Sequence, residues 1–511
     1  MIFNNKYSLF FVKAFSIAFL LLPLSVFATK NNGSETFYDY CLPQKESYDQ
    51  NLKFAEGSFS SFGWNYIGLT TNKPVELIFS KPEHKFDKIL FRFTSAIWLP
   101  KRFRVELYLL KSKKIINSIE VWNTYFLQPF EIEIEDTFVQ QIFKEGVGLR
   151  PVGLESTFFI YADNDKNIPV QFKPALLYSR GSTLKRIEII KRMTDVSTLQ
   201  FFGWPEGCLW DCIYDLGEVF PKIESARIIQ GRLNYFKNDK NNLDYLIHHN
   251  IRLSNEIFDV ETILPFGVFS KFMPNDTLVK QALNFCLSQM NENGIITHNV
   301  GEDIKVKTEE NYTVSYPLLL IAKNSNNPQL VDIAVKNLLY RKSLLSAENG
   351  IYHRKIGANN PIYLNWARGT TWYLLGLAKS LKLIPRNHPK YNELLTEFQT
   401  VSSKIARMAD SNGMYRAFLH DKSSFYDTSG TSGITAAFAY GVKNDFLSQS
   451  EFSPLIKKSI NELLTNYVTP DGYLRGSTQI NNGGEELQSS DFRTISPYTL
   501  GFVGMILSCG Y

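Results

Sequence analysis

Carboxylate side chains before two expected helices are the best candidates for acid–base chemistry in this chain. The stretch VKTEENYTVSYPLLLIAKN places Glu309 and Glu310 immediately before an apolar helix. Acidic side chains at this position also favour the helix dipole, so helix capping is an equally strong interpretation. If the pair reaches a substrate, Glu310 is the candidate general acid/base.

A second pair of acids lies upstream, in NEIFDVETILPFGVFSKF. Asp259 and Glu261 precede another helix of the same character, and Asp259 is the candidate partner of Glu310. A single acid in such a place is more often structural than catalytic. No His and Cys residues have the spacing of zinc ligands, so neither a metal nor another cofactor is expected.

Aromatic and basic residues crowd the start of the expected helix in NWARGTTWYLLGLAKSL. Leu374, Leu377 and Leu381 form its buried face. An arginine at a helix N-terminus faces the positive end of the dipole, which is unfavourable. A binding role would explain it, because Trp366 and Trp372 could stack on a sugar ring while Arg368 holds a carboxylate.

Four Asn-Gly or Asp-Gly turns recur in the second half of the chain. They lie in ENGIITH, ENGIYHR, SNGMYRA and PDGYLRG, which begin 56, 63 and 59 residues apart. Repeats of this length predict stacked helical hairpins. If the turns share one mouth, their side chains converge there, and we expect His298 and His353 to bind substrate. The other turn residues in this group are Tyr352, Arg354, Tyr415, Arg416 and Arg475.

A third cluster lies in FYDTSGTSGITAAFAYGV, where Asp427 and Ser429 precede a helix. Capping is the simpler interpretation of Asp427, and Ser429 is a candidate substrate-binding residue. The long polar stretch GSTQINNGGEELQSSDFRTISPYTLG is long enough to be a functional loop over the site.

The elements that must position these residues are helical from about residue 201 to residue 511. There is room for about six hairpins, which could form an open solenoid or close into an (α/α)6 toroid. The last helix, in SPYTLGFVGMILSCGY, is apolar almost all round. An end helix of a solenoid needs a polar face, so a buried last helix favours the closed toroid.

Residues 29–200 alternate apolar and polar side chains in short runs, such as KILFRFTSAIW and RFRVELYLL. This pattern predicts a β-sandwich domain. Residues 1–28 resemble a signal peptide, with a basic start, an apolar stretch and the cleavage pattern SVFA. We therefore expect an exported, periplasmic or secreted protein.

Charge and composition narrow the partners. The net charge of +5 is small for 511 residues, and no basic cluster occurs, so nucleic acid is not expected. No run after the signal reaches about 18 apolar residues, so no membrane span is expected. Among the five cysteines, Cys208 and Cys212 are close enough to suggest a disulfide. The oligomeric state stays open.

Taken in order, these motifs resemble the unsaturated uronyl hydrolases of glycoside hydrolase families 105 and 88. WARGTTW is similar to the family pattern W-x-R-G/A-x-G-W, GIYHRKIG to G-L-Y-H-x-W-D, and YDTSGTSGITAAFAYGV to E-x-S-x-S/T-A. TEENYTVSYP falls where the family has D-x-L-Y-M-x-x-P. The chain departs from these patterns at Glu310, where the family has Asp, and at Thr371, where it has Gly.

The resemblance implies an enzyme that removes an unsaturated uronic acid from oligosaccharides made by polysaccharide lyases. An acid, Glu310 by this alignment, would protonate C4 of the double bond, and water would add at C5. His353, Trp366, Arg368 and Trp372 would hold the sugar. Two alternatives stay open: a glycan-binding toroid without activity, and another glycosidase that uses two opposed acids.

Overall fold

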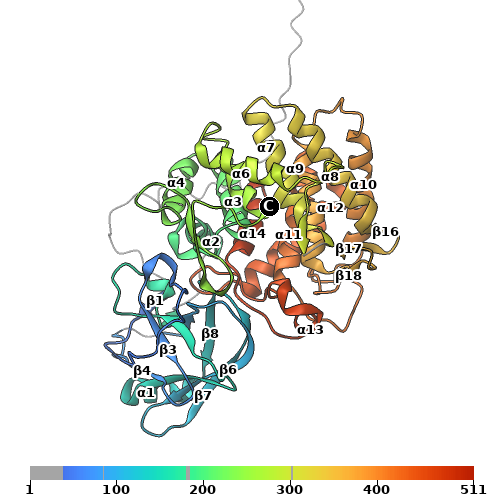
Figure 1. The fold of residues 1–511 in the computed structure, drawn as a ribbon. Helices are drawn as coiled ribbons and strands as arrows, with labels where there is room; N and C mark the ends of the chain where they lie inside the picture. The colour runs from blue at the N-terminus through green and yellow to red at the C-terminus, as the bar shows by residue number, and fades with distance from the viewer. Residues whose placement is uncertain (1–37, 84–85, 180–184, 301–302) are drawn as a thin grey trace, which may run out of the picture. The chain divides into compact units, whose positions relative to one another are not determined.

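Antiparallel sheets occupy the first part of the chain. The computed structural model describes residues 38–83, 86–179, 185–300 and 303–511, and the expected signal peptide at residues 1–28 lies outside them. A four-stranded sheet has the order β1-β11-β5-β8, and a five-stranded sheet has the order β2-β4-β9-β6-β7 (Figure 1). Their bounds are β1 Tyr38–Cys41, β2 Lys45–Ser47, β4 Val75–Ile78, β5 Lys88–Thr94, β6 Leu99–Leu109, β7 Ile115–Thr124, β8 Pro129–Ile134, β9 Val147–Val152 and β11 Ala175–Ser179.

Side chains from both sheets meet in one buried core. Phe91 and Phe93 of β5 and Val105 and Leu107 of β6 belong to the same cluster. Each pair is two residues apart, as expected for strands that bury one face. The helix α1 (Asp136–Glu145) adds Phe138 and its neighbours to this core. The strands β3 (Tyr66–Leu69) and β10 (Phe158–Tyr161), which are far apart in the sequence, pair with each other in an antiparallel arrangement.

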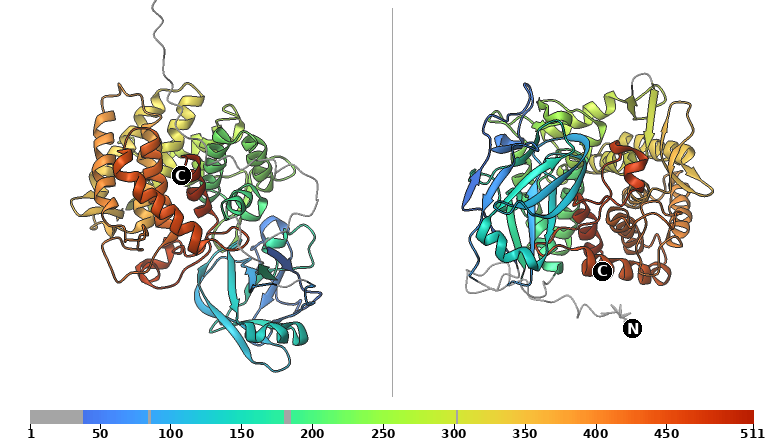
Figure 2. Two further views of the ribbon diagram at one scale, coloured as in Figure 1. Left: turned by 180° about the vertical axis from the view of Figure 1, so that it is seen from behind. Right: turned by 90° about the horizontal axis from the view of Figure 1, so that it is seen from below.

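Six helices contact one another in a closed cycle in the rest of the chain. Each contacts the next, and α14 contacts α3, although the two are far apart in the sequence (Figure 2). In order they are α3 Trp204–Val219, α5 Ile263–Phe269, α7 Tyr316–Asn324, α9 Ala367–Leu381, α11 Thr428–Lys443 and α14 Tyr498–Ser508. Every residue of α14 is buried, which confirms the prediction for the last helix.

A second set of helices packs outside the first, one against each member of the cycle. They are α2 Lys185–Thr194, α4 Ser225–Tyr235, α6 Thr277–Ser288, α8 Gln329–Leu345, α10 Tyr391–Ala406 and α12 Gln449–Glu462. Because α2 packs on α14, the helical part begins near Lys185, earlier than the predicted boundary at residue 200. The described residues from Tyr38 to Tyr511 belong to one compact unit.

Glycines allow the closest contacts between the inner helices. A Cβ on Gly376 of α9 would lie 2.5 Å from the backbone of Asn311, and a Cβ on Gly501 of α14 would lie 2.7 Å from the carbonyl oxygen of Cys208 in α3. No real Cβ tolerates such distances, so these backbones approach closely only because no side chain intervenes.

A small sheet at the ends of the helices holds part of the cavity wall described below. Its strands are β14 His298–Val300, β15 Asp303–Lys307, β16 Ser346–Ala347, β17 Gly350–Ile356 and β18 Ile362–Leu364. β15 pairs with both β14 and β17, so residues from two of the repeat turns become neighbours.

Two sequence expectations have simple outcomes. Cys208 and Cys212 are both free and buried, so the suggested disulfide is wrong; they lie one turn apart inside α3, where each thiol packs as a small apolar group. Within the described ranges, no helix has both the length and the apolar character needed to cross a membrane.

Candidate active site

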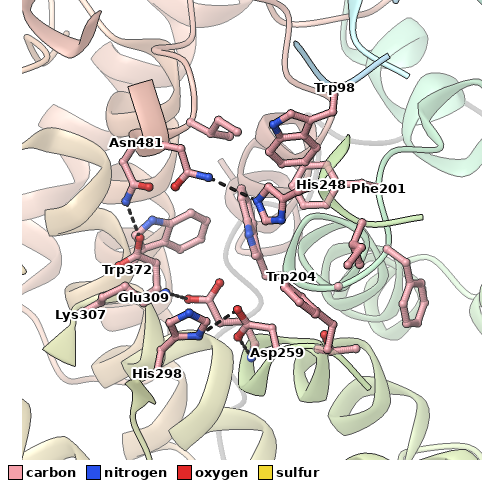
Figure 3. A pocket seen from close by; sticks show the side chains of 18 of the residues that line it. Trp98, Phe201, Trp204, His248, Asp259, His298, Lys307, Glu309, Trp372 and Asn481 are labelled. Atoms are coloured by element: carbon pink, nitrogen blue, oxygen red, sulfur yellow. Dashed lines mark hydrogen bonds and ion pairs between the residues drawn. The ribbon is translucent and has the colours of Figure 1, made fainter. Parts of the chain in front are cut away.

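A cavity of about 250 Å³ brings together three acids, four tryptophans and several polar groups from both halves of the chain (Figure 3). Of the predicted site residues, Asp259, His298, Trp366, Arg368 and Trp372 line it. Further lining residues include Trp98, Trp204, His248, Phe258, Glu261, Lys305, Lys307, Glu309, Ile480, Asn481 and Asn482. The cavity therefore has the aromatic walls and convergent carboxyl groups typical of a carbohydrate site.

Asp259 is fixed from two sides. Its carboxylate caps the short helix Val260–Thr262 by accepting a hydrogen bond from the Glu261 backbone N–H at 2.9 Å. The other oxygen lies 3.1 Å from Nδ1 of His298. Burial opposes ionisation of Asp259, but the hydrogen bond from His298, the charges of Lys307 and His298 and the backbone N–H of Glu261 together outweigh it and lower the pKa of the carboxyl. The same bond raises the pKa of His298.

Glu261 and Lys307 form a buried ion pair in the cavity wall, with Nζ 2.7 Å from Oε1. Burial, together with the negative charges of Asp259 and Glu309, raises the pKa of Glu261 to about 7, although Lys307 opposes the shift. Three acids share one lysine here, so the cluster retains a proton near neutral pH.

Glu309 reaches the cavity with one oxygen unused. Its Oε1 accepts a hydrogen bond from Nδ2 of Asn481 at 3.1 Å. Its Oε2 is buried without a hydrogen-bond partner and lies 3.3 Å from Nδ1 of His353. A buried carboxylate oxygen without a partner is costly in a folded protein. This oxygen is enclosed beside His353 behind the wall, so a group in the cavity does not reach it in this conformation.

His353 supports this wall from behind and does not line the cavity. Its Nδ1 lies 2.9 Å from Oγ1 of Thr308, and its Nε2 lies 2.8 Å from Nδ2 of Asn481. Burial lowers the pKa of His353 to about 3, so the ring is neutral at pH 7. The predicted sugar contact is therefore replaced by a contact with Asn481, which itself lines the cavity.

The entrance of α9 is built around Arg368. The guanidinium donates to the carbonyl oxygens of Thr478 and Gln479 and to the hydroxyl of Tyr498, and it lies 4.6 Å from the ring of Trp366. These partners explain an arginine at a helix N-terminus. They also show that its bonds go to the loop before α14, whereas a carboxylate was expected.

The two predicted tryptophans form part of the wall. Trp372 stacks on Tyr312 with ring centres 5.9 Å apart and meets the edge of Trp204 at 5.3 Å. Trp366 is buried, and its Nε1 has no hydrogen-bond partner. Both rings therefore present apolar surface to the cavity, and neither needs to move to do so.

The comparisons with known proteins agree with this site. The sequence profile of Glycosyl Hydrolase Family 88 matches residues 183–509. The chain belongs to Glycosyl Hydrolase Family 88. The resemblance inferred from the motifs is thereby confirmed.

Two curated relatives are similar over part of their length. The chain is 28% identical over 156 residues to an unsaturated 3S-rhamnoglycuronyl hydrolase of Formosa agariphila, covering 28% of this chain and 41% of the relative. It is 24% identical over 157 residues to an enzyme of the same name from Alteromonas sp. (strain LOR), covering 29% and 37%. The alignments thus span less than half of either relative.

A solved structure described as a possible member of the GH105 family, from Salmonella enterica, has the same fold in the helical part. The TM-score is 0.54 at 16% identity, and the match covers 63% of this chain and 92% of that chain. A corresponding protein from Klebsiella pneumoniae gives 0.53 at 18% identity, covering 65% and 94%. At this identity the likeness concerns the fold alone.

The family motif selects Glu310 by counting back from Pro317, but Glu310 does not line the cavity. It is fully buried, its Oε2 is 2.9 Å from Nη2 of Arg341, and the same oxygen accepts the Lys307 backbone N–H. A π-helical turn, η7 (Asn311–Ser315), separates the glutamates from α7. A π turn holds one more residue than an α-helical turn, so counting residues back from Pro317 does not decide which glutamate faces the cavity, and it is Glu309 that lines it.

Ser429 and most of the repeat-turn residues also lie away from the cavity. Ser429 donates to Asp427, which caps α11. Arg416 pairs with Asp410, and Arg475 lies near Glu131 on the first sheets. The four turns therefore do not share one mouth, because only the turns with His298 and His353 pair through β15.

Several lining residues of this family member carry no signal in the sequence. Trp98 and His248 lie in segments that show no repeat or motif, and Lys307 resembles an ordinary strand lysine. Asn481 belongs to the long polar loop that was expected to lie over the site, and its neighbours Ile480 and Asn482 also line the cavity.

Proposed function

We propose that this protein hydrolyses the bond between an unsaturated uronic acid and the rest of a lyase-generated oligosaccharide, by hydrating the C4=C5 double bond. Family membership and the acids in an aromatic cavity support this proposal. The single observation that carries it is the convergence of the Asp259, Glu261 and Glu309 carboxyl groups on one aromatic cavity, where the cluster retains a proton near pH 7.

In the proposed reaction, the proton that the cluster of Asp259, Glu261 and Glu309 retains is given to C4 through Glu309, although neighbouring positive charges lower the pKa of Glu309 itself. The positive charge that develops at C5 is shared with the ring oxygen. Water adds at C5 and returns a proton to the Glu309 carboxylate. The resulting hemiketal opens to a ketone, and the sugar attached at C1 leaves as an alcohol. The negative charges of Asp259 and of Glu261, once the proton has left, would stabilise the cation at C5.

The finer architecture is part of the proposal. We propose that the closed cycle of helices is a complete (α/α)6 toroid and that the two N-terminal sheets form a β-sandwich. The fold of the GH105 structures and the core shared by the sheets support these assignments. The signal-peptide pattern in residues 1–28 supports export, and the substrate would then be met outside the cytoplasm.

The names of the two curated relatives suggest where to begin. Unsaturated fragments with rhamnose next to the uronic acid are the first substrates to test, followed by pectic, gellan and glycosaminoglycan fragments. We expect the absorbance of the double bond to fall and a 4-deoxy-5-keto-uronic acid to be released. If the protein binds these sugars but the absorbance falls with none of them, the proposal of a hydrolase is rejected in favour of a glycan-binding protein.

A further inference from the structure

The N-terminal sheets contribute one aromatic ring to the cavity. Trp98 lies just before β6, is almost fully buried and lines the cavity beside residues of the helical part. Its ring centre is 4.2 Å from that of His248, at 58°. His248 in turn lies 6.0 Å from Phe258. These three residues, which we name the aromatic shelf, lie in a row in the cavity wall. Figure 3 shows Trp98 beside His248.

The shelf is held in place by Asn250. Its Oδ1 accepts the Trp98 backbone N–H at 2.8 Å, and its Nδ2 donates to the carbonyl oxygens of Ala96 and Phe59. Asn250 is fully buried and adopts a left-handed backbone conformation, with φ 59°. This clamp fixes Trp98 relative to His248, so the shelf is preformed.

The shelf runs from the interior of the cavity wall to the surface, next to the acids. Phe258 is 46% exposed and directly precedes Asp259, whereas Trp98 is 6% exposed, about as buried as Glu309 at 7%. A sugar ring seated at the acids with C1 toward the shelf would place its C1 substituent over these rings. Asn482 is exposed beside it, with Nδ2 3.4 Å from Nε2 of His248, and could bind a hydroxyl group.

From this arrangement we infer that the aromatic shelf binds the pyranose ring attached to the unsaturated uronic acid, and that the N-terminal sheets take part in substrate selection through Trp98. The inference rests on the proposed function for the identity of the first sugar. Apolar ring faces favour the C–H face of a pyranose. Burial lowers the pKa of His248, so the ring is neutral at pH 7 and the shelf carries no charge of its own.

The test compares two substrates that share the same unsaturated uronic acid: its methyl glycoside and the lyase-generated disaccharide. In Phe258→Ala, the ratio of kcat/KM for the disaccharide to that for the methyl glycoside should fall about tenfold, which equals about 1.4 kcal/mol. Trp98→Ala should lower the ratio at least as much, and Trp98→Phe should restore part of it. Phe425→Ala, which removes a 51% exposed aromatic ring outside the cavity, should leave the ratio unchanged.

If the variants lose kcat/KM equally on both substrates, or on neither, the shelf is rejected as a binding site for the second sugar, even when hydrolysis is established. If the wild-type protein consumes neither substrate, the proposed function fails. Calorimetric binding of the same two compounds then tests the shelf by itself. Tighter binding of the disaccharide that Phe258→Ala abolishes would uphold the shelf. Equal affinity for both compounds, or no binding, would reject it. Since Phe258 is exposed, its variant tests the shelf even if Trp98→Ala does not fold.

Discussion

Glu309 and Glu310 are adjacent in the sequence, yet their carboxyl groups have different surroundings. Glu309 lines the cavity and accepts a hydrogen bond from Asn481, whereas Glu310 is held by Arg341 in the interior. Which of the two the chemistry uses can be decided by amide substitutions, because glutamine keeps the size of the side chain and removes the acid.

Glu309→Gln should reduce kcat/KM on an unsaturated oligosaccharide by about 100-fold or more, the usual contribution of a general acid. The melting temperature should stay close to that of the wild type, since the amide keeps the contact with Asn481. Kinetics and thermal unfolding on the same preparation provide both values. Full activity in this variant would rule out Glu309 as the acid.

Glu310→Gln should instead act on stability. Removing the charge leaves the buried guanidinium of Arg341 without its anion, which costs about 3 kcal/mol of the free energy of unfolding. Activity per folded molecule should persist. An inactive variant with a wild-type melting temperature would return the catalytic role to Glu310, as the family alignment predicts.

The proton held by the acid cluster predicts the pH dependence. Because burial and neighbouring carboxylates raise the pKa of Glu261 to about 7, activity should fall as the pH rises through 7 and the cluster loses its proton. In Glu261→Gln this limb of the profile of kcat/KM should move or disappear. A limb that remains unchanged in the variant would assign the titration to another group.

At the scale of the elements, helix packing depends on backbone contact between η7 and α9. Gly376→Ala would place a methyl group 2.5 Å from the Asn311 backbone, so the two elements must separate. We expect a loss of about 1–3 kcal/mol in the free energy of unfolding and, because η7 follows Glu309, a loss of activity.

Gly231 in α4 is the matched control for this substitution. Among the described residues, a Cβ on Gly231 would have no neighbour within 4 Å beyond its own helix backbone. Gly231→Ala should therefore stabilise the protein by about 0.5–1 kcal/mol through helix propensity alone. Urea unfolding of both variants measures the difference. Equal effects would show that close packing at Gly376 is unimportant.

Most elements could be predicted from the sequence, because their periodicity is local. The helix expected in NWARGTTWYLLGLAKSL is α9, and the strand predicted in RFRVELYLL lies largely within β6. The aromatic entrance of α9 was also found from local composition. That Glu309 and not Glu310 lines the cavity could not be predicted, because a π turn leaves no mark in residue spacing. The partners of Arg368 could not be predicted because they lie about 110 residues further along the chain.

At the scale of the whole molecule, the sheets and helices are joined through Asp471, a residue of the last repeat turn. Its buried carboxylate pairs with Arg92 of β5 and with Arg192 of α2, and Arg92 also pairs with Glu131. Burial opposes the ionisation of Asp471, but the two arginines outweigh it and lower the pKa. This network braces the chain, while Trp98 connects the same sheets to the cavity.

Asp471→Asn should lower the free energy of unfolding at pH 7 by about 3 kcal/mol, because the buried Arg192 loses its anion and Arg92 keeps only Glu131. A lowered folded-state pKa stabilises the protein fully above the unfolded pKa of about 3.9, and the contribution is lost as the pH falls toward the folded value. The difference between variant and wild type should therefore shrink at pH 3. Glu133→Gln, at an exposed pair with Lys88, should change stability by less than about 0.5 kcal/mol.

The contact between α3 and α14 also constrains how the chain can fold. The two helices begin about 290 residues apart, so their pairing is among the most distant contacts of the molecule. During synthesis the apolar face of α3 has no partner until α14 has been made. We therefore expect closure of the helix cycle to be slow, and the exposed face of α3 to aggregate or to bind chaperones until it closes. A chain truncated before Tyr498 should keep that face exposed and stay bound to chaperones.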